Sequence, residues 1–217
     1  MLERGYADRD EAGRVLGDVL ARRLGPRDAD PPPLVLALPR GGVPVAARVA
    51  EAVGGDLDVI VARKIAAPGR PEYGVGAIAE DGPPVFDHAA LRDLGLTEND
   101  LAGTVQRERV ELGRRIERYR GGRPIADPAG RVVIVVDDGV ATGVTARAAL
   151  RWLRLRPVRR LVLAAPVCSR EAERALAADA DLVICPQHPA RFLAVGAWYL
   201  DFAQLSDADV ARALGGS

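Results

Sequence analysis

The sequence predicts an α/β protein with a doubly wound, five-stranded parallel sheet, and three observations lead to this fold class. Short, continuous apolar runs of the kind found in buried parallel strands recur along the 217 residues. Segments with a helical spacing of apolar residues separate these runs. Nearly half of the residues (48%) are apolar, which suffices for a substantial core in one domain with an appendage.

The expected strands and helices alternate in chain order. Five apolar runs predict strands at residues 34–38, 57–62, 132–136, 161–166 and 182–185. Helices are expected at 43–53, 144–155 and 169–178, and a loop rich in Pro and Gly at 64–73. Such alternation gives right-handed crossovers and a parallel sheet whose ligands bind at the carboxyl ends of the strands.

Three further segments complete a single domain whose core covers about residues 34–185. Asp8 and Glu11 form a capping-box-like start and predict an amphipathic first helix. Thr97 with Asp100 predicts the cap of a charged helix near residues 98–119, within a helical insertion at about 83–125. That helix is expected to face solvent or a second subunit of a homo-oligomer. Residues from about 186 to 217 are expected to form a small C-terminal hood together with the first helix.

Composition excludes several classes of function. The 30 basic and 30 acidic residues balance, so neither nucleic acid nor an anionic membrane is an expected partner. No apolar run approaches the roughly 20 residues that span a bilayer, and the first residues lack the plan of a signal peptide, so a cytoplasmic location is expected. Cys168 and Cys185 are expected in the core, and His88 and His188 are too few for a metal site built mainly on imidazole.

The strongest chemical signal follows the predicted strand at 132–136. Asp137 and Asp138 come directly after it, and a Gly-containing turn with Thr142 and Thr145 then leads into a helix. Amide N–H groups at a helix N-terminus suit a phosphate, whereas two carboxylates suit the hydroxyls of a vicinal diol. A diol beside a phosphate describes ribose 5-phosphate. The alternative is an Asp-rich turn and a simple helix cap, which would need neither both acids nor both threonines.

The run from Val132 to Thr145 resembles the signature of the type I phosphoribosyltransferases: apolar residues, two acids and a Thr-Gly-x-Thr phosphate loop. The resemblance extends over roughly residues 34–202, with the insertion left out. It implies that Asp137 and Asp138 hold the ribose hydroxyls of 5-phosphoribosyl-1-diphosphate. It also implies that a loop wraps the 5-phosphate, made by Ala141, Thr142, Gly143, Val144 and Thr145.

A second turn, Pro39-Arg40-Gly41-Gly42, follows the first predicted strand. Amide groups beside two glycines and a guanidinium can bind diphosphate. In the family the corresponding turn binds the diphosphate, often through a cis peptide. Arg40, Gly41 and Gly42 are therefore candidate diphosphate ligands.

The predicted loop at 64–73 carries the candidate leaving-group chemistry. Lys64 is the only lysine of the chain, and a cation at a strand end beside the diphosphate can stabilise the departing group. The Arg63-Lys64 pair and the later Glu72-Tyr73-Gly74 are similar to the closing loop of adenine phosphoribosyltransferases. Lys64, Glu72 and Arg40 are thus the catalytic candidates, with Glu72 as general acid or base or, alternatively, a residue of a solvated loop.

The tail from Phe192 to Phe202 resembles the hood of hypoxanthine-guanine phosphoribosyltransferases, with one extra residue between Gly196 and Asp201. This implies that Phe192, Trp198 and Asp201 lie around the acceptor base, and core packing is the alternative for the two aromatic residues. Ala141 stands where enzymes for 6-oxopurines have an aspartate. The resemblance of the tail thus favours a 6-oxopurine as the acceptor, whereas Ala141 and the Glu-Tyr-Gly sequence favour adenine.

These observations predict an enzyme of nucleotide metabolism, a Mg²⁺-dependent glycosyltransferase that moves phosphoribose from 5-phosphoribosyl-1-diphosphate to a purine-like nitrogen base. Mg²⁺ is expected to be held chiefly by substrate oxygens and water. The alternative is a regulator that senses the donor or a nucleotide without turnover. The Gly74–Ala79 segment fits a dinucleotide glycine pattern without its strand–turn–helix context, so it is expected to form a strand or arm.

Overall fold

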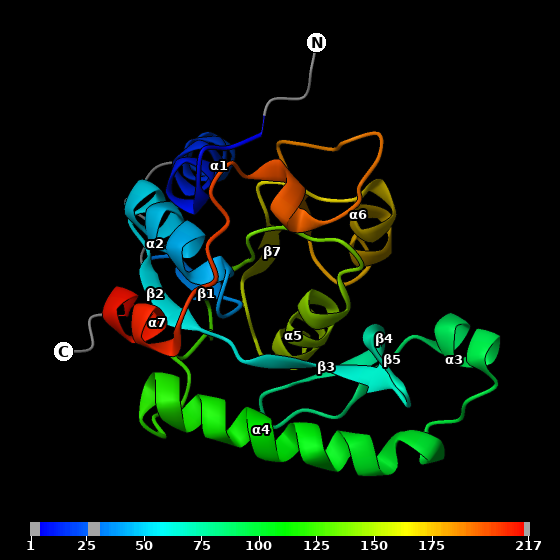
Figure 1. Ribbon diagram of the computed structural model, residues 1–217. Coiled ribbons are helices and arrows are strands. Elements are labelled where there is room, and N and C mark those ends of the chain that lie inside the picture. The colour runs from blue at the N-terminus through cyan, green and yellow to red at the C-terminus, as the bar shows by residue number, and fades with distance from the viewer. Residues whose placement is uncertain (1–4, 26–30, 215–217) are drawn as a thin grey trace.

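The central sheet has five parallel strands, as the sequence predicts, and their order is β2-β1-β6-β7-β8 (Figure 1). The computed structural model describes residues 5–25 and 31–214. The strands are β1 (Leu34–Ala37), β2 (Asp56–Val59), β6 (Val132–Val136), β7 (Arg160–Ala164) and β8 (Leu182–Ile184). Each neighbouring pair is parallel.

Helices cover both faces of this sheet, which is why its strands are apolar throughout. Side chains of a strand alternate between the two faces, and Ile134 and Val136 pack into one core with α1 (Arg9–Leu24) and α2 (Gly42–Val53). Val133 and Val135 pack into a second core with α5 (Val144–Arg154) and α6 (Arg170–Leu176). The sheet is therefore doubly wound.

The order of the strands creates a topological switch point between β1 and β6. The chain leaves β1 through α2 toward β2 on one side, and it leaves β6 through α5 toward β7 on the other. The turns that follow β1 and β6 consequently meet at the carboxyl edge of the sheet, where α/β proteins bind their ligands.

A small antiparallel sheet of β3 (Ala62–Ala67), β4 (Arg70–Ala79) and β5 (Val85–Phe86) forms an arm beside the main sheet. The predicted loop at 64–73 is wrong, because these residues form the β3–β4 hairpin, with Gly69 at φ 69° in its turn. The predicted strand at 57–62 is also too long. The apolar run passes from the main sheet to the arm between Val59 and Ala62, and periodicity alone does not reveal that change of sheet.

The insertion holds α3 (His88–Leu94), a 3₁₀ turn η1 (Asn99–Leu101) and α4 (Ala102–Arg120). The expected long charged helix is confirmed, although its first turn is 3₁₀, and α3 was not predicted. The Thr97 amide donates to the Asp100 carboxylate at 2.8 Å, as a capping box requires. Figure 1 shows α4 running below the arm, and its buried Leu112 and Tyr119 face the core.

The first helix and the tail lie together over one end of the sheet. Asp8 caps α1 by accepting from the Glu11 amide at 2.8 Å, which confirms the predicted start. Tyr6 pairs with Tyr199 in a parallel bridge, and the Tyr6 amide donates to the Trp198 carbonyl at 2.8 Å. The tail contains the 3₁₀ turn η2 (Val195–Trp198) and α7 (Asp207–Ala213), and α7 contacts α2 and α4.

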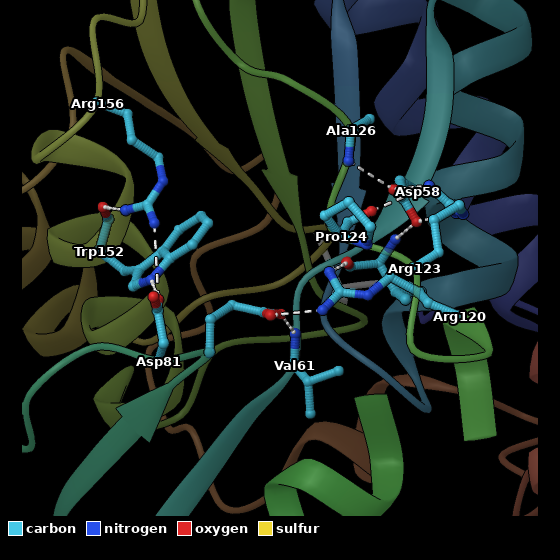
Figure 2. A network of polar contacts seen from close by, with 11 residues as sticks. Asp58, Val61, Asp81, Arg120, Arg123, Pro124, Ala126, Trp152 and Arg156 are labelled. Atoms are coloured by element: carbon cyan, nitrogen blue, oxygen red, sulfur yellow. Dashed lines mark hydrogen bonds and ion pairs between the residues drawn. The ribbon is translucent and has the colours of Figure 1, made fainter. Parts of the chain in front are cut away.

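A buried polar network holds the arm against the main sheet (Figure 2). Arg120 at the end of α4 donates to Glu80 at 2.5 Å, and Glu80 accepts from the Val61 amide at 2.7 Å. Both charged side chains are almost fully buried. Because Val61 lies between β2 and β3, this network fixes the point at which the chain leaves the main sheet.

A second part of the network anchors the segment that precedes β6. Asp58, which is 1% exposed, accepts two hydrogen bonds from the Arg123 guanidinium, both at 3.1 Å, and one from the Ala126 amide at 2.9 Å. A separate contact joins the end of β4 to α5. The Trp152 indole donates to Asp81 at 2.6 Å, and the Arg156 guanidinium lies over the Trp152 ring (Figure 2).

Cys168 is buried as predicted, and Cys185 is half-buried. Within residues 5–25 and 31–214, every helix is too short or too polar to cross a membrane.

Candidate functional site

Asp137 and Asp138 stand at the carboxyl end of β6, at the switch point. The Asp138 amide donates to the Asp137 carboxylate at 2.9 Å, so the two side chains are held in a tight local turn. Asp138 is 9% exposed and accepts from Arg9 Nε at 2.8 Å. The sequence thus correctly places both acids directly after the strand, at the carboxyl edge of the sheet.

Burial governs the charge of this pair. It raises the pKa of Asp137 well above its usual range, and the neighbouring charge of Asp138 raises that pKa further. Burial also raises the pKa of Asp138, but the hydrogen bond and the charge of Arg9 oppose this effect. Perturbed carboxyl groups of this kind are typical of functional sites.

The turn after β1 lies directly against these acids. The Pro39–Arg40 peptide bond is cis, as the family resemblance implies. A Cβ atom at Gly41 would lie 2.0 Å from Asp138 Oδ2, and one at Gly42 would lie 2.6 Å from the Val136 carbonyl oxygen. The glycines therefore allow the turn and the acids to share one edge of the sheet.

Arg40 extends from this turn toward the tail. Its guanidinium lies 3.8 Å from the Asp207 carboxylate at the start of α7. Tyr119 donates to the same carboxylate at 2.7 Å, and this hydrogen bond, aided by nearby guanidinium groups, lowers the pKa of Asp207. Arg40 is thus held at the rim, with its side chain 33% exposed.

The predicted phosphate loop joins Asp138 to the N-terminus of α5. Gly143 is the N-cap of α5 at φ 72°, and within the described residues no side chain caps the helix. A Cβ atom at Gly143 would lie 2.5 Å from Leu176, so the loop is packed against α6. Ser169 donates its hydroxyl hydrogen to the Ala141 carbonyl at 2.6 Å and thereby fixes the outer side of the loop. The amide groups of Val144 and Thr145 lie in the first turn of α5.

Three residues that were not predicted as site residues lie next to Asp138: Tyr199, Phe202 and Arg9. Tyr199 donates its hydroxyl hydrogen to the Asp138 carbonyl at 2.5 Å, and its ring stacks on Phe202 with centroids 5.1 Å apart. The Arg9 guanidinium lies 3.8 Å from the centroid of Phe202. Arg9 comes from a segment remote in sequence, and the pairing of Tyr6 with Tyr199, with further backbone hydrogen bonds between this segment and the tail, brings it to the site. Nothing in its local sequence signals that position.

Two hollows open beside these groups. One of about 360 Å³ is lined by Arg9, Arg40, Gly41, Asp138, Phe202, Gln204 and Leu205. The other, of about 440 Å³, lies between the phosphate loop and the tail, and its lining includes Ala141, Thr142 and Phe192. The first hollow thus joins the turn after β1 to Asp138, and the second joins the predicted phosphate loop to the tail.

The candidate base-binding residues do not gather at one point. Phe192 lines the second hollow. Trp198 packs with Tyr6 and Tyr199, and its indole Nε1 is buried and has no hydrogen-bond partner within the described part of the chain. Asp201 is exposed, and its carboxylate accepts from the Ala203 amide at 3.0 Å. The packing of Trp198 corresponds to the core alternative for that residue.

Comparison with known proteins decides the family. A family model described as a phosphoribosyl transferase domain matches residues 11–197. This chain belongs to the phosphoribosyl transferase domain family. Two Mycobacterium tuberculosis strains each have a protein named "Putative phosphoribosyl transferase" that is 41% identical over 205 residues. The match covers 94% of this chain and 45% of the relative, so the chain spans less than half the length of these curated relatives.

A solved structure is similar to this chain over nearly its whole length. The protein TT1426 from Thermus thermophilus is 44% identical, covers 97% of each chain and superposes with a TM-score of 0.79. The two proteins therefore share one fold over nearly the whole of this chain.

Within the phosphoribosyl transferase domain, the arm carries the remaining candidates. Lys64 pairs with Ala77 across the β3–β4 hairpin, and a Cβ atom at Gly74 would lie 2.9 Å from its Cδ atom. Gly74 thus leaves room for the stem of Lys64. Glu72 is a residue of β4, and its side chain lies outside the part that the structure describes.

Proposed function

We propose that this phosphoribosyl transferase domain moves phosphoribose from 5-phosphoribosyl-1-diphosphate to a nitrogen base and releases diphosphate. One observation carries the proposal: a Gly-Gly turn, two acids and a helix N-terminus meet at one switch point. Among the described residues, no side chain caps that helix. Each part suits one portion of the donor. The turn suits diphosphate, the acids suit the ribose hydroxyls, and the helix N-terminus suits the 5-phosphate.

The 5-phosphate would bind at Ala141, Thr142, Gly143, Val144 and Thr145. Amide groups at the start of α5 point at this position, and the helix dipole favours an anion there. Ala141 and Thr142 are exposed in the structure, so a ligand can reach the loop. The Thr142 and Thr145 hydroxyls add donors for phosphate oxygens.

The ribose would lie over Asp137 and Asp138, which accept hydrogen bonds from its two hydroxyls. As the bond to diphosphate breaks, positive charge develops on the sugar ring in an oxocarbenium-like transition state. Buried carboxylates beside the ring stabilise that charge, because they act in a site of low dielectric constant.

The diphosphate would bind to the Gly41 and Gly42 amides, with Arg40 and Lys64 as its cations. Arg40 lies at the rim beside Asp207, from which it can turn toward an anion in the hollow. Lys64 is a residue of β3, the strand of the arm that follows β2 in the chain. Both cations would neutralise charge on the leaving group, and this contributes directly to the rate.

Mg²⁺ suits this donor set as a cofactor. The oxygen ligands of Mg²⁺ would come mainly from the diphosphate, the ribose and water, since the ion dehydrates reluctantly. In the described residues no group of three or more His, Cys, Asp and Glu side chains could hold a metal ion by itself. When bound, Mg²⁺ would supply charge neutralisation on the diphosphate.

The acceptor is proposed to be a purine or a similar heterocycle. Phe192 lines the hollow beside the phosphate loop, where a flat base gains from contact with an aromatic face. Trp198 and Asp201 remain candidates through the hood, and Glu72 through the arm. A proton on the accepting nitrogen must be removed, and Glu72 is proposed as the base.

The test is a panel of nucleobases with the donor and Mg²⁺, read by release of diphosphate. We expect turnover with at least one purine-like base, and no turnover by Asp137→Asn/Asp138→Asn. Calorimetry should show that the double variant keeps its fold and loses affinity for the donor. Donor binding without turnover on any base would favour a regulator that senses the donor, and unchanged donor affinity of the double variant would contradict the site.

A further inference from the structure

Arg9 forms an ion pair with Asp138, an acid of the proposed ribose site, and it also contacts the C-terminal tail. Its Nε atom donates to Asp138 Oδ2 at 2.8 Å, and its Nη1 atom donates to the Ala203 carbonyl at 3.0 Å. Both side chains of the ion pair are nearly buried, with 11% and 12% exposed. A pair so well shielded from water is screened little by salt.

The aromatic residues of the hood fix the position of this guanidinium. Arg9 lies over the Phe202 ring, Phe202 stacks on Tyr199, and Tyr199 donates to the Asp138 carbonyl. Arg9, Phe202, Tyr199 and Asp138 thus form a closed ring in which each residue contacts the next. A guanidinium held on an aromatic face loses little further freedom when it orients a carboxylate.

The ion pair leaves room for a ligand on the same carboxylate. Arg9 contacts Asp138 through one nitrogen and one oxygen rather than as a two-point fork. A carboxylate has about four acceptor positions, so Oδ1 and the second lone pair of Oδ2 can still accept from a hydroxyl. Arg9 therefore need not leave when a diol binds.

The charges that face Asp138 make its ionisation depend on Arg9. Asp137 lies beside it on the same strand end, the Tyr199 hydroxyl group faces it from the hood, and Arg40 lines the same hollow from the turn after β1. Two adjacent buried carboxylates cannot both carry a charge without a cation nearby. Arg9 is the cation in hydrogen-bond contact, while Arg40 is turned toward Asp207.

We propose that Arg9 is a positioning residue that keeps Asp138 ionised and directs its carboxylate toward the ribose hydroxyls, while the hood holds Arg9 in place. This rests on the proposed function, since the ribose is the ligand of that site. Burial raises the pKa of both acids, and the charge of Arg9 opposes this rise at both, but it is Asp138 that also accepts a hydrogen bond from Arg9. Asp138 is consequently the acid of the pair that ionises first, and Asp137 is the acid that retains its proton longer.

The first test measures binding of ribose 5-phosphate by calorimetry in Mg²⁺-free buffer from about pH 5 to about pH 9. In Arg9→Met we expect affinity at neutral pH to fall roughly tenfold or more and to recover as pH rises, because each pKa unit corresponds to a factor of about ten. Arg9→Lys should keep most of the affinity. The ligand phosphate titrates equally in every arm, so the difference between variants isolates the protein.

Arg48→Met is the matched control. Arg48 ion-pairs with Asp10, the neighbour of Arg9 on α1, yet it does not touch the acids. Its removal should leave the pH profile of binding unchanged. Parallel profiles for Arg9→Met and the wild type would overturn the proposal, because a residue that only holds the hood would lower affinity equally at every pH.

The second test needs no variant and no ligand. The carboxyl carbon signals of Asp137 and Asp138 can be followed against pH by NMR in the wild-type chain, and Asp138 should lose its proton at the lower pH. The opposite order would overturn the role of Arg9. A wild-type chain that shows this order but does not bind ribose 5-phosphate would contradict the proposed function and leave the charge assignment standing.

Discussion

Gly41 and Asp138 are in direct contact, since a Cβ atom at Gly41 would lie 2.0 Å from Oδ2 of that aspartate. A Cβ atom at Gly42 would instead meet the backbone, at 2.6 Å from the Val136 carbonyl oxygen. The first contact is with the end of a side chain, which can move, and the second is with a strand of the central sheet, which cannot. The two glycines therefore serve different purposes.

The first prediction separates these purposes by alanine substitution. Gly42→Ala should lower the free energy of unfolding by about 1–3 kcal/mol, as overpacking of a rigid site does. Gly41→Ala should displace the Asp138 carboxylate and abolish binding of ribose 5-phosphate with a smaller loss of stability. Urea unfolding and calorimetry measure the two effects.

Gly113→Ala is the control for these substitutions. Gly113 lies in the interior of α4, and a Cβ atom there meets no described atom within 4 Å. Alanine should raise stability by roughly 0.4–1 kcal/mol. Equal losses of stability in Gly41→Ala and Gly42→Ala would show that the distinction between the two contacts is wrong.

The second prediction concerns stability and pH at Asp137. Burial raises the pKa of this carboxyl in the folded state, so the folded state binds more protons than the unfolded state once pH exceeds about 3.8, the ordinary value. Stability then falls as pH rises through the folded pKa. Asp137→Asn removes this loss and should therefore be more stable than the wild type at neutral pH.

Thermal unfolding at several pH values checks this prediction. The two proteins should have similar stability below pH 3.8, where both states are protonated, and the variant should gain as pH rises. Each kcal/mol corresponds to roughly 2–4 °C in a chain of this size. Asp18→Asn, at an exposed position on α1, should show no such gain. A variant less stable than the wild type at neutral pH would contradict the assignment.

The sequence sufficed for the central sheet because each parallel strand is buried on both faces and reads as a continuous apolar run. Val132–Val136 is such a run, and the acids after it lie where the sequence predicted. Gly74–Ala79 was expected to form a strand or arm, but the β3–β4 hairpin was missed, because Ala62–Ala67 is only partly buried and the start of β4 carries Pro71 and Gly74. Such segments satisfy the criteria for a loop equally well.

Arg9 could not be predicted as a site residue, since its role depends on two ends of the chain that meet only in the folded state. The parallel bridge of Tyr6 with Tyr199 brings the segment before α1 beside the tail. Local sequence gives α1 its cap at Asp8 but carries no information about a partner nearly two hundred residues away. By contrast, the predicted phosphate loop lies in one continuous segment, so its position at the start of α5 could be predicted from local sequence.

The third prediction is that Lys64→Ala slows turnover far more than it weakens binding of ribose 5-phosphate. The proposed charge of Lys64 acts on the leaving diphosphate, which ribose 5-phosphate lacks. Loss of one such group typically reduces the rate about 10²–10³-fold. Steady-state kinetics and calorimetry on the same preparation compare the two quantities, and an equal loss in both would place Lys64 elsewhere.

The fourth prediction concerns the buried pair of Glu80 and Arg120. Their side chains are 6% and 2% exposed, so Arg120→Met leaves a buried carboxylate without its cation. This should cost about 3–5 kcal/mol of stability, whereas Glu80→Gln/Arg120→Met, which removes both charges, should cost less. Urea unfolding measures both.

The exposed pair of Arg212 and Asp209 supplies the control for that prediction. Arg212→Met should change stability by less than about 1 kcal/mol, as is usual for ion pairs in water. If the double variant at Glu80 and Arg120 were as unstable as Arg120→Met alone, an unpaired buried carboxylate would not be the cause of the loss, because the glutamine that replaces Glu80 carries no charge and can still accept from the Val61 amide.

The last prediction is about the acceptor base. Phe192 lines the hollow next to the phosphate loop, and Ala141 in that loop carries no carboxylate to face a 6-oxopurine. Glu72 lies in β4, the strand that carries the Glu-Tyr-Gly sequence. A purine or purine-like heterocycle should therefore be accepted in preference to orotate, uracil or an amine. Glu72→Gln should impair turnover more than Phe192→Leu, because loss of a general base typically costs about 10²–10⁴-fold, whereas loss of an aromatic contact costs about 1 kcal/mol. A base panel with the wild type and both variants measures each part. Preference for orotate or uracil would contradict the purine assignment, and turnover indifferent to Glu72→Gln would leave Glu72 without a role in the reaction.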